Sequence, residues 1–390
     1  MQKYCIRCGE VMYYRQSKQK KRRNIHLPFD IPFKIIGIVL FVAILIAAGY
    51  FYYTKTKGAS LDSSIKVAPF DKTNIYSASN DYAYYVKDGT LHILDSGMSE
   101  KKTVQLTVKG EDLKITSVEN VCVAYNSSYV QVLNTGGSSL FLKEFSSDVN
   151  TVHASKSYVG VLRNYDTDKK QNIINIYDYT GKEVDKITLT TQYVLDFGFS
   201  ANGTNMWILA IDTSSATAIT KITNYNVADK TTTAIIPISG QIISKVNFSS
   251  KEIYAIGLTH SQCYSNIGDQ VDSKSFLIYG FNYLDSVINS NGNYVAIFAP
   301  QNSATINILR LINGSSSPIN IQMPPSVTDA CVYGDNIYAF AGKTVYKYNL
   351  SGSKTGTYDM KYDITNATKI DNSPLILLET SDGLKVFNLK

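Results

Sequence analysis

The stretch DNIYAFAGKTVYKYNLSG, residues 335–352, decides the fold. Two runs rich in Ile, Val, Tyr and Phe flank the turn Gly342-Lys343, and a second turn, NLSG, ends at Gly352. Apolar runs of this length around a glycine turn are typical of β-hairpins. The stretch therefore predicts two antiparallel strands, the second of which closes in a turn that leads onward.

The closing turn recurs along the chain with a near-constant spacing. It is found as LDSG (Gly97), LNTGG (Gly136), DYTG (Gly181), LINGS (Gly314) and NLSG (Gly352). The first three glycines are 39 and 45 residues apart and the last two are 38 apart, while the 133 residues between the third and the fourth correspond to three periods. Two units there, near Asp229 and near Asn282, lack the glycine. A period near 40 with several strands per unit is typical of a β-propeller, whereas the alternative, a β-sandwich or a pair of them, requires no common period.

The repeats predict an all-β propeller of eight blades, with seven as the alternative. The third strand of each unit is expected near residues 90–95, 128–133, 172–179, 217–228, 275–282, 304–312, 344–350 and 384–389. The last unit ends before a fourth strand, and SSIKVAPF (residues 63–70) precedes the first unit without a partner. We expect this segment to supply the missing strand and close the ring, which removes an exposed sheet edge. The fifth unit is the weak point, because no room for an outer strand remains after residues 275–282.

A membrane-spanning helix is predicted ahead of the repeats. Residues 35–53, IIGIVLFVAILIAAGYFYY, contain no charge and no proline, and as a helix they would span roughly 28 Å. Residues 1–34 carry nine Lys or Arg and two acidic residues, so the positive-inside rule places them in the cytoplasm. The predicted parts are a basic head (1–34), the helix (35–53), a linker (54–60) and an extracytoplasmic propeller (61–390). A cleaved signal peptide is the alternative, although the head is long and the apolar run exceeds the usual length.

This order of parts carries a family resemblance. A basic head, an apolar span and repeats such as TVYKYNLSG cover nearly the whole chain. In this layout the protein resembles an uncharacterised family of single-pass, membrane-anchored β-propeller proteins of Gram-positive, clostridia-like bacteria. That family is similar in shape to quinoprotein-like and WD-like propellers. The resemblance implies the fold and the anchor but assigns no functional residues.

No catalytic constellation is visible in the sequence, and we expect no enzyme. His92, His153 and His260 fall in three different repeats, without metal-ligand spacing. Cys122 and Cys331 lie among apolar neighbours and are expected to be buried thiols. The binding-loop candidates are His260 and Cys263, in THSQCYSNIGDQVDSK (residues 259–274), which is expected to be a long loop. Long loops on a rigid scaffold often carry binding functions.

The head contains half of a zinc knuckle, YCIRCGE (residues 4–10). Cys5 and Cys8 have the spacing of a zinc site, but tetrahedral zinc takes four ligands and the head offers only His26 besides them. A remnant of a lost site is one interpretation. The other is zinc shared by two chains, which would make the protein a homodimer. No other cofactor is expected.

The sequence thus favours a non-catalytic binding or scaffold module of the cell envelope. Its expected partners are the lipid bilayer and an envelope protein or wall polymer, and we expect no nucleic-acid partner, because the basic residues precede a membrane span. An extracytoplasmic enzyme with a site in the propeller channel is the alternative, as is a transmembrane sensor.

Overall fold

The structure is a computed structural model that describes residues 41–47 and 64–390, except 147, 167, 170, 201–202, 213, 215–218 and 250. Residues 41–47, inside the predicted span, are helical, and the rest of that span lies outside the described residues. In the part of the chain that the structure describes, no helix combines the length and the apolar character needed to cross a membrane. All described strands belong to the compact unit Gly58–Lys390.

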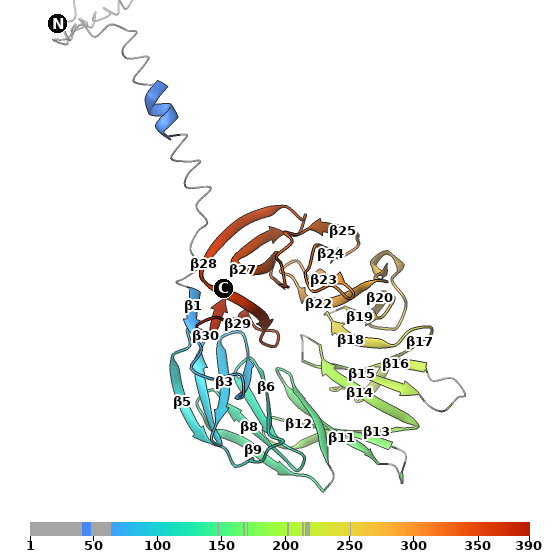
Figure 1. Ribbon diagram of the computed structural model, residues 1–390. Helices are drawn as coiled ribbons and strands as arrows, with labels where there is room; N and C mark the ends of the chain where they lie inside the picture. The colour runs from blue at the N-terminus through green and yellow to red at the C-terminus, as the bar shows by residue number, and fades with distance from the viewer. Residues whose placement is uncertain are drawn as a thin grey trace, which may run out of the picture. The chain divides into compact units, whose positions relative to one another are not determined.

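The described strands form seven sheets arranged as a ring (Figure 1). In six sheets, four consecutive strands pair in sequence order, all antiparallel. Sheet one contains β2 (Ile75–Ala78), β3 (Tyr82–Lys87), β4 (Thr90–Asp95) and β5 (Glu100–Gln105). Sheet two contains β6 (Lys114–Val118), β7 (Val121–Tyr125), β8 (Tyr129–Asn134) and β9 (Ser139–Glu144). Sheet three contains β10 (Val149–Ala154), β11 (Tyr158–Asp166), β12 (Gln171–Asp178) and β13 (Glu183–Thr190).

The next three sheets follow the same order. Sheet four contains β14 (Gln192–Phe199), β15 (Asn205–Asp212), β16 (Ile219–Asn226) and β17 (Thr231–Ile238). Sheet five contains β18 (Ile243–Phe248), β19 (Glu252–Gly257), β20 (His260–Ser265) and β21 (Phe276–Leu277), with the 3-10 helix η2 (Asp272–Lys274) before β21. Sheet six contains β22 (Phe281–Ile288), β23 (Tyr294–Pro300), β24 (Ile308–Asn313) and β25 (Ser316–Gln322).

The seventh sheet is wider than the others. It contains six strands in the order β1-β30-β29-β28-β27-β26. Their bounds are β1 (Ile65–Val67), β26 (Asp329–Tyr333), β27 (Asn336–Asn349), β28 (Lys354–Lys369), β29 (Leu375–Thr380) and β30 (Gly383–Asn388). The first half of β28 pairs with β27 and its second half pairs with β29. The separate sheets therefore number seven, because the last two predicted repeats are joined along β28. Eight blades were the first prediction from the sequence, and seven were the stated alternative.

The predicted ring closure is confirmed. Strand β1 pairs antiparallel with β30, with Ile65 opposite Phe387 and Val67 opposite Lys385. The first and the last described strand therefore belong to the same sheet. Phe70, just after β1, is buried against Tyr76 and Tyr85 of sheet one, with ring centroids 5.4 Å away in both cases.

Several of the closing turns are stabilised by one side chain at the end of the third strand. Asp95 Oδ1 accepts hydrogen bonds from the backbone N–H groups of Gly97 and Ser99, both at 2.9 Å. Asp178 and Asn349 make the same pair of bonds in their own turns. Asp and Asn favour such turns because their short side chains replace a backbone hydrogen bond. The recurrence of Asp or Asn with a glycine one to three residues later thus has a local physical cause.

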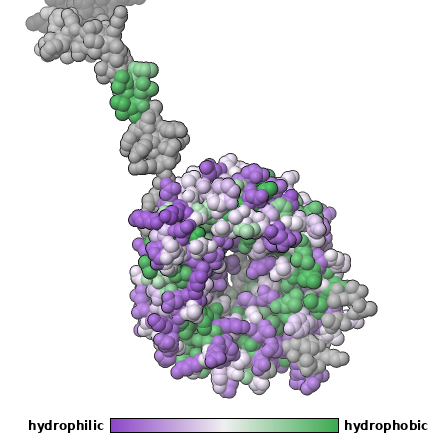
Figure 2. Space-filling view, in the orientation of Figure 1, coloured by the Kyte–Doolittle hydropathy of each residue, from purple (hydrophilic) through white to green (hydrophobic). Residues whose placement is uncertain are grey.

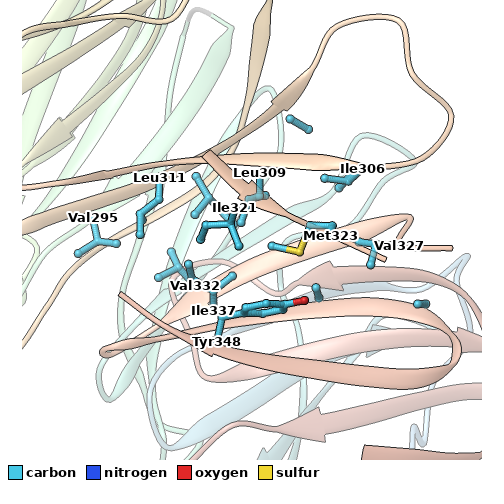
Figure 3. Packing of buried hydrophobic residues seen from close by; sticks show 14 residues of the cluster. Val295, Ile306, Leu309, Leu311, Ile321, Met323, Val327, Val332, Ile337 and Tyr348 are labelled. Atoms are coloured by element: carbon cyan, nitrogen blue, oxygen red, sulfur yellow. The ribbon is translucent and has the colours of Figure 1, made fainter. Parts of the chain in front are cut away.

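The core lies between neighbouring sheets rather than in one central cluster. Figure 3 shows the cluster between sheets six and seven, where apolar side chains of the two sheets meet. They include Val295, Leu309 and Leu311 from sheet six and Val332 and Ile337 from sheet seven, all at most 1% exposed. Comparable clusters fill the other interfaces. Each sheet is therefore stabilised mainly by its two neighbours.

Two faces of the ring follow from this topology. The first strand of each sheet lies at the inside of the ring, since β2 contacts β6, β6 contacts β10 and β10 contacts β14. We call the side where these first strands begin the start face, and the side where they finish the end face. Because consecutive strands are antiparallel, connections between sheets and those between second and third strands lie on the start face. Residue Ile65 lies at the end face, opposite the last residues of β30.

Candidate functional site

The structure separates the sequence-predicted site residues. Cys5 and Cys8 lie outside the described residues. His260 and Cys263 both lie in β20, three residues apart, so their side chains point to opposite faces of the strand. His260 is exposed, whereas Cys263 is fully buried among residues of sheets five and six. The structure therefore does not bring these two side chains together.

The expectation of one long loop over residues 259–274 is wrong. Its first half is β20, the third strand of sheet five, and only the part after Ser265 is a connection. The expected third strand at residues 275–282 is likewise wrong, because Phe276–Leu277 is the short outer strand β21 and β22 begins at Phe281. Gly268, with φ of +95°, occupies the closing turn of this sheet. The glycine of the fifth unit is thus present in YSNIG, and this was the signal that could have located the strand.

His260 lies beside a polar cleft formed by sheet five and the connection that precedes β18. The cleft measures about 490 Å³ and is lined by Gln241, Thr259, His260, Gln262, Gln270 and other polar residues. Gln241 links two segments of the cleft wall. The Gln241 Oε1 atom accepts hydrogen bonds from the backbone N–H groups of Thr259 at 3.2 Å and His260 at 3.0 Å. Gln241 Nε2 donates to Gln262 Oε1 at 2.7 Å. A Cβ at Gly257 would lie 2.1 Å from Gln241 Oε1, so a glycine there makes room for the amide.

Four large apolar side chains of sheet five and its connections are exposed at the start face. Ile242 precedes β18, Leu258 lies between β19 and β20, and Leu277 and Tyr279 lie at the end of β21 and in the connection after it. Their exposed fractions lie between 57% and 72%. We call these four residues the sheet-five surface. Exposed apolar residues on one face of one sheet mark interaction surfaces more often than isolated ones do.

A second candidate site is a cavity of about 370 Å³ inside the ring. Figure 2 shows that the molecule is hollowed in the middle of the ring. The cavity is lined by the final residues of first strands, among them His153 of β10, Asp196 of β14, Lys245 of β18 and Ser286 of β22, and by Lys369 of β28. It therefore opens toward the end face.

Two pairs of charged or ionisable side chains shape the cavity wall. His153 Nε2 lies 3.1 Å from Asp196 Oδ1, and this pair joins sheets three and four. Lys369 Nζ donates to Asp285 Oδ1 at 3.2 Å, to Asp285 Oδ2 at 3.0 Å and to the Val332 carbonyl at 3.1 Å. This second pair is nearly buried, with side chains 9% and 15% exposed. Such contacts fix the first strands relative to one another across the sheet boundaries.

Carboxylates also tie neighbouring sheets through backbone groups. Asp285 Oδ2 accepts the Val332 N–H at 2.9 Å, and Asp371 Oδ2 accepts the Ala78 N–H at 2.9 Å. Asp329 Oδ2 accepts the Ala367 N–H at 3.2 Å, and burial raises the pKa of the Asp329 carboxyl. These bonds are charge-assisted and therefore stronger than neutral ones. The Asp285 bond joins sheet six to sheet seven, the Asp329 bond joins the two halves of sheet seven, and the Asp371 bond joins sheet seven to sheet one.

β-Bulges position several of the cavity residues, and the sequence did not reveal them. The pairing register shifts just before Asp196 in β14, Lys245 in β18 and Asp285 in β22. A bulge inserts one unpaired residue and re-aims the side chains that follow. Because the inserted residue is not restricted to a recognisable type, the pattern of apolar and polar residues does not mark it.

The described cysteines are buried thiols, as expected for Cys122 and Cys331. Burial raises the pKa of the Cys263 thiol to about 12, and it raises the pKa values of Cys122 and Cys331 as well. Among the residues that the structure describes, no group of three or more His, Cys, Asp or Glu side chains is placed to hold a metal ion.

A ring of antiparallel sheets, closed by pairing of the first and the last described strand and packed sheet against sheet, defines a β-propeller. The chain belongs to a family of unknown function, DUF5711, which matches residues 154–389. A comparison with curated protein sequences gave no match.

Solved structures share this fold. The Dos1 propeller aligns over 85% of this chain and 96% of its own, with 10% identity and a TM-score of 0.57. The C-terminal WD40 domain of Sif2 aligns over 82% of this chain and 97% of its own, with 11% identity and a TM-score of 0.53. BamB from Moraxella catarrhalis aligns over 86% and 99%, with 14% identity and a TM-score of 0.47, too low to support an argument. At these identities the likeness concerns the fold alone.

Proposed function

We propose that the protein is a non-catalytic binding or scaffold module of the bacterial cell envelope. In this proposal residues 35–53 anchor it in the membrane, residues 1–34 lie in the cytoplasm and the propeller lies outside. The order of basic head, apolar span and propeller supports this arrangement. Protease added to intact, wall-stripped cells should digest the propeller, and protection of residues 60–390 would overturn the orientation.

The observation that carries the binding role is the sheet-five surface. Ile242, Leu258 and Tyr279 are exposed on three connections and Leu277 at the end of β21, and hydrogen bonds to Gln241 link two of these connections. A rigid apolar surface with an exposed tyrosine is the usual centre of a protein–protein interface. The surface lies on the start face, whereas the chain enters the ring at the end face. The partner that fits an apolar surface of this kind is another protein, in this proposal one of the envelope.

The test compares two double variants of the full-length protein in its own cells. Leu258→Ser with Tyr279→Ser removes apolar area from the sheet-five surface, and Ile235→Ser with Leu142→Ser removes exposed apolar area elsewhere. After chemical cross-linking and solubilisation, a partner recovered with the wild type should be lost from the first variant and kept by the control. Equal recovery with both variants, each confirmed to unfold at the wild-type temperature, would refute the role of this surface.

We also propose that any zinc in the protein is shared between two chains through Cys5 and Cys8. Two thiolates from each chain would complete the four ligands that structural zinc takes. About half a zinc per chain and a dimer that is lost in Cys5→Ser with Cys8→Ser would support this. A metal-free monomer in both proteins would contradict it.

A further inference from the structure

The cavity inside the ring contains two opposite charges that are not paired with each other. Asp196 and Lys245 lie on the adjacent first strands β14 and β18, each directly after a β-bulge, and both line the cavity. The Asp196 side chain is 41% exposed and Lys245 is exposed as well. Among the described residues, Lys245 forms no ion pair, and Asp196 pairs only with His153. Neither charge is therefore neutralised by the other.

The remaining groups around the cavity are already engaged. All three N–H donors of Lys369 have acceptors on Asp285 and Val332, so this ammonium group is a structural element of the wall. The described contacts of Asp196, from His153 Nε2 and the Phe197 N–H, both go to Oδ1. Asp196 Oδ2 and the Lys245 ammonium are thus the charged groups of the cavity that can still bind a ligand.

The size and the uncharged lining limit what the ligand can be. A volume of about 370 Å³ is at the lower end for small-molecule sites. Asn247 and Asn372 add amide donors and acceptors, and Phe199 and Trp207 add aromatic surface. Gly198 leaves space for the indole ring, because a Cβ there would lie 2.6 Å from Trp207 Cζ2.

We propose that this cavity binds a small zwitterion, an α-amino acid or a short peptide with free ends. The carboxylate binds the ammonium of Lys245, and the ligand ammonium binds Asp196. The amides of Asn247 and Asn372 hydrogen-bond the polar body between the two charges. An ion with only one sign of charge would engage only one of these two protein groups. This inference concerns a different face from the sheet-five surface and does not rest on the proposed function.

Trp207 provides the assay. It is the only tryptophan of the chain and it lines the cavity, so its fluorescence reports binding there. The full-length protein in detergent is titrated with L-alanyl-L-alanine, its N-acetyl derivative, its C-terminal amide and free L-alanine. The free dipeptide should change the emission saturably. Acetylation or amidation should each weaken binding about tenfold or more, since a hydrogen bond to a charged group contributes roughly 1.5–3 kcal/mol. Whether free alanine binds as well as the dipeptide distinguishes an amino-acid source from a peptide source.

Two variants assign the charges to the two ends. Lys245→Met should abolish the preference for the acid over the amide, and Asp196→Asn should abolish the preference for the free amine over the acetylated form. Lys87→Met and Asp359→Asn, at exposed positions in β3 and β28, should keep both preferences. No saturable change with any zwitterion, full affinity for the acetylated dipeptide, or preferences that survive in both cavity variants would overturn the proposal.

Discussion

Closure of the ring by β1 should contribute a large part of the stability of the propeller. Ile65 is 7% exposed and packs in the core of sheet seven, and Phe70 is 5% exposed and packs between sheets seven and one. Truncating a buried Ile to Ala typically costs about 2–5 kcal/mol, and a buried Phe about 3–5 kcal/mol, because apolar burial is lost and a cavity remains. Native proteins are stable by only about 5–15 kcal/mol, so either change is large.

Val67 supplies the matched control on the same strand. It is 71% exposed, so Val67→Ala should change the free energy of unfolding by no more than about 0.5 kcal/mol. Ile65 and Phe70 belong to different clusters, so the effects of Ile65→Ala and Phe70→Ala should be close to additive.

The assay is urea unfolding of the full-length protein in detergent, followed by Trp207 fluorescence. Trp207 lies in sheet four, distant along the chain from β1, so it reports the loss of closure only if the ring unfolds as one unit. The same midpoint and slope for Ile65→Ala and Val67→Ala would refute a stabilising role of the buried Ile65 side chain. An unchanged midpoint for Phe70→Ala would mean that closure contributes no stability to the ring.

Three further changes test the interior. Lys369→Met should destabilise the protein by about 3–5 kcal/mol, because it leaves the Asp285 carboxylate nearly buried without its partner, and adding Asp285→Asn should recover part of the loss in urea unfolding. Gly198→Ala should cost about 1–3 kcal/mol, since its Cβ would overlap Trp207, and should shift the tryptophan emission; an unchanged spectrum and midpoint would contradict the packing. Cys263 should react with a thiol reagent at pH 8 only in denaturant, because its pKa of about 12 leaves almost no thiolate and the side chain is buried; rapid modification of the native protein at this residue would show that β20 opens.

The sequence predicted most of the ring because its turns carry their own chemistry. The Asp or Asn at the end of a third strand and the glycine after it act locally, as Asp95 and Gly97 do, so they can be read without knowing the fold. Ring closure was also predictable, because an unpaired strand at one end matched a missing strand at the other. The joined last sheet was not, since nothing in residues 354–369 marks that β28 continues from one repeat into the next.

The candidate sites were less accessible to sequence reasoning. The segment HSQCYS, which forms β20, contains few of the apolar residues that usually mark a strand, so its pattern predicts a loop around His260 and Cys263. The cavity residues Asp196 and Lys245 lie on different sheets and are aligned by β-bulges, so their proximity depends on tertiary structure alone. The sheet-five surface has the same origin, because it gathers side chains from three separate connections.

The most direct test of the account is site-specific photo-crosslinking in intact cells. A photoreactive amino acid replaces Tyr279 in the sheet-five surface of the full-length protein, or Leu142 in β9 as the control position. We expect a discrete adduct with an envelope protein from position 279 and none from position 142. The absence of any adduct at position 279, or the same adducts from both positions, would contradict the account.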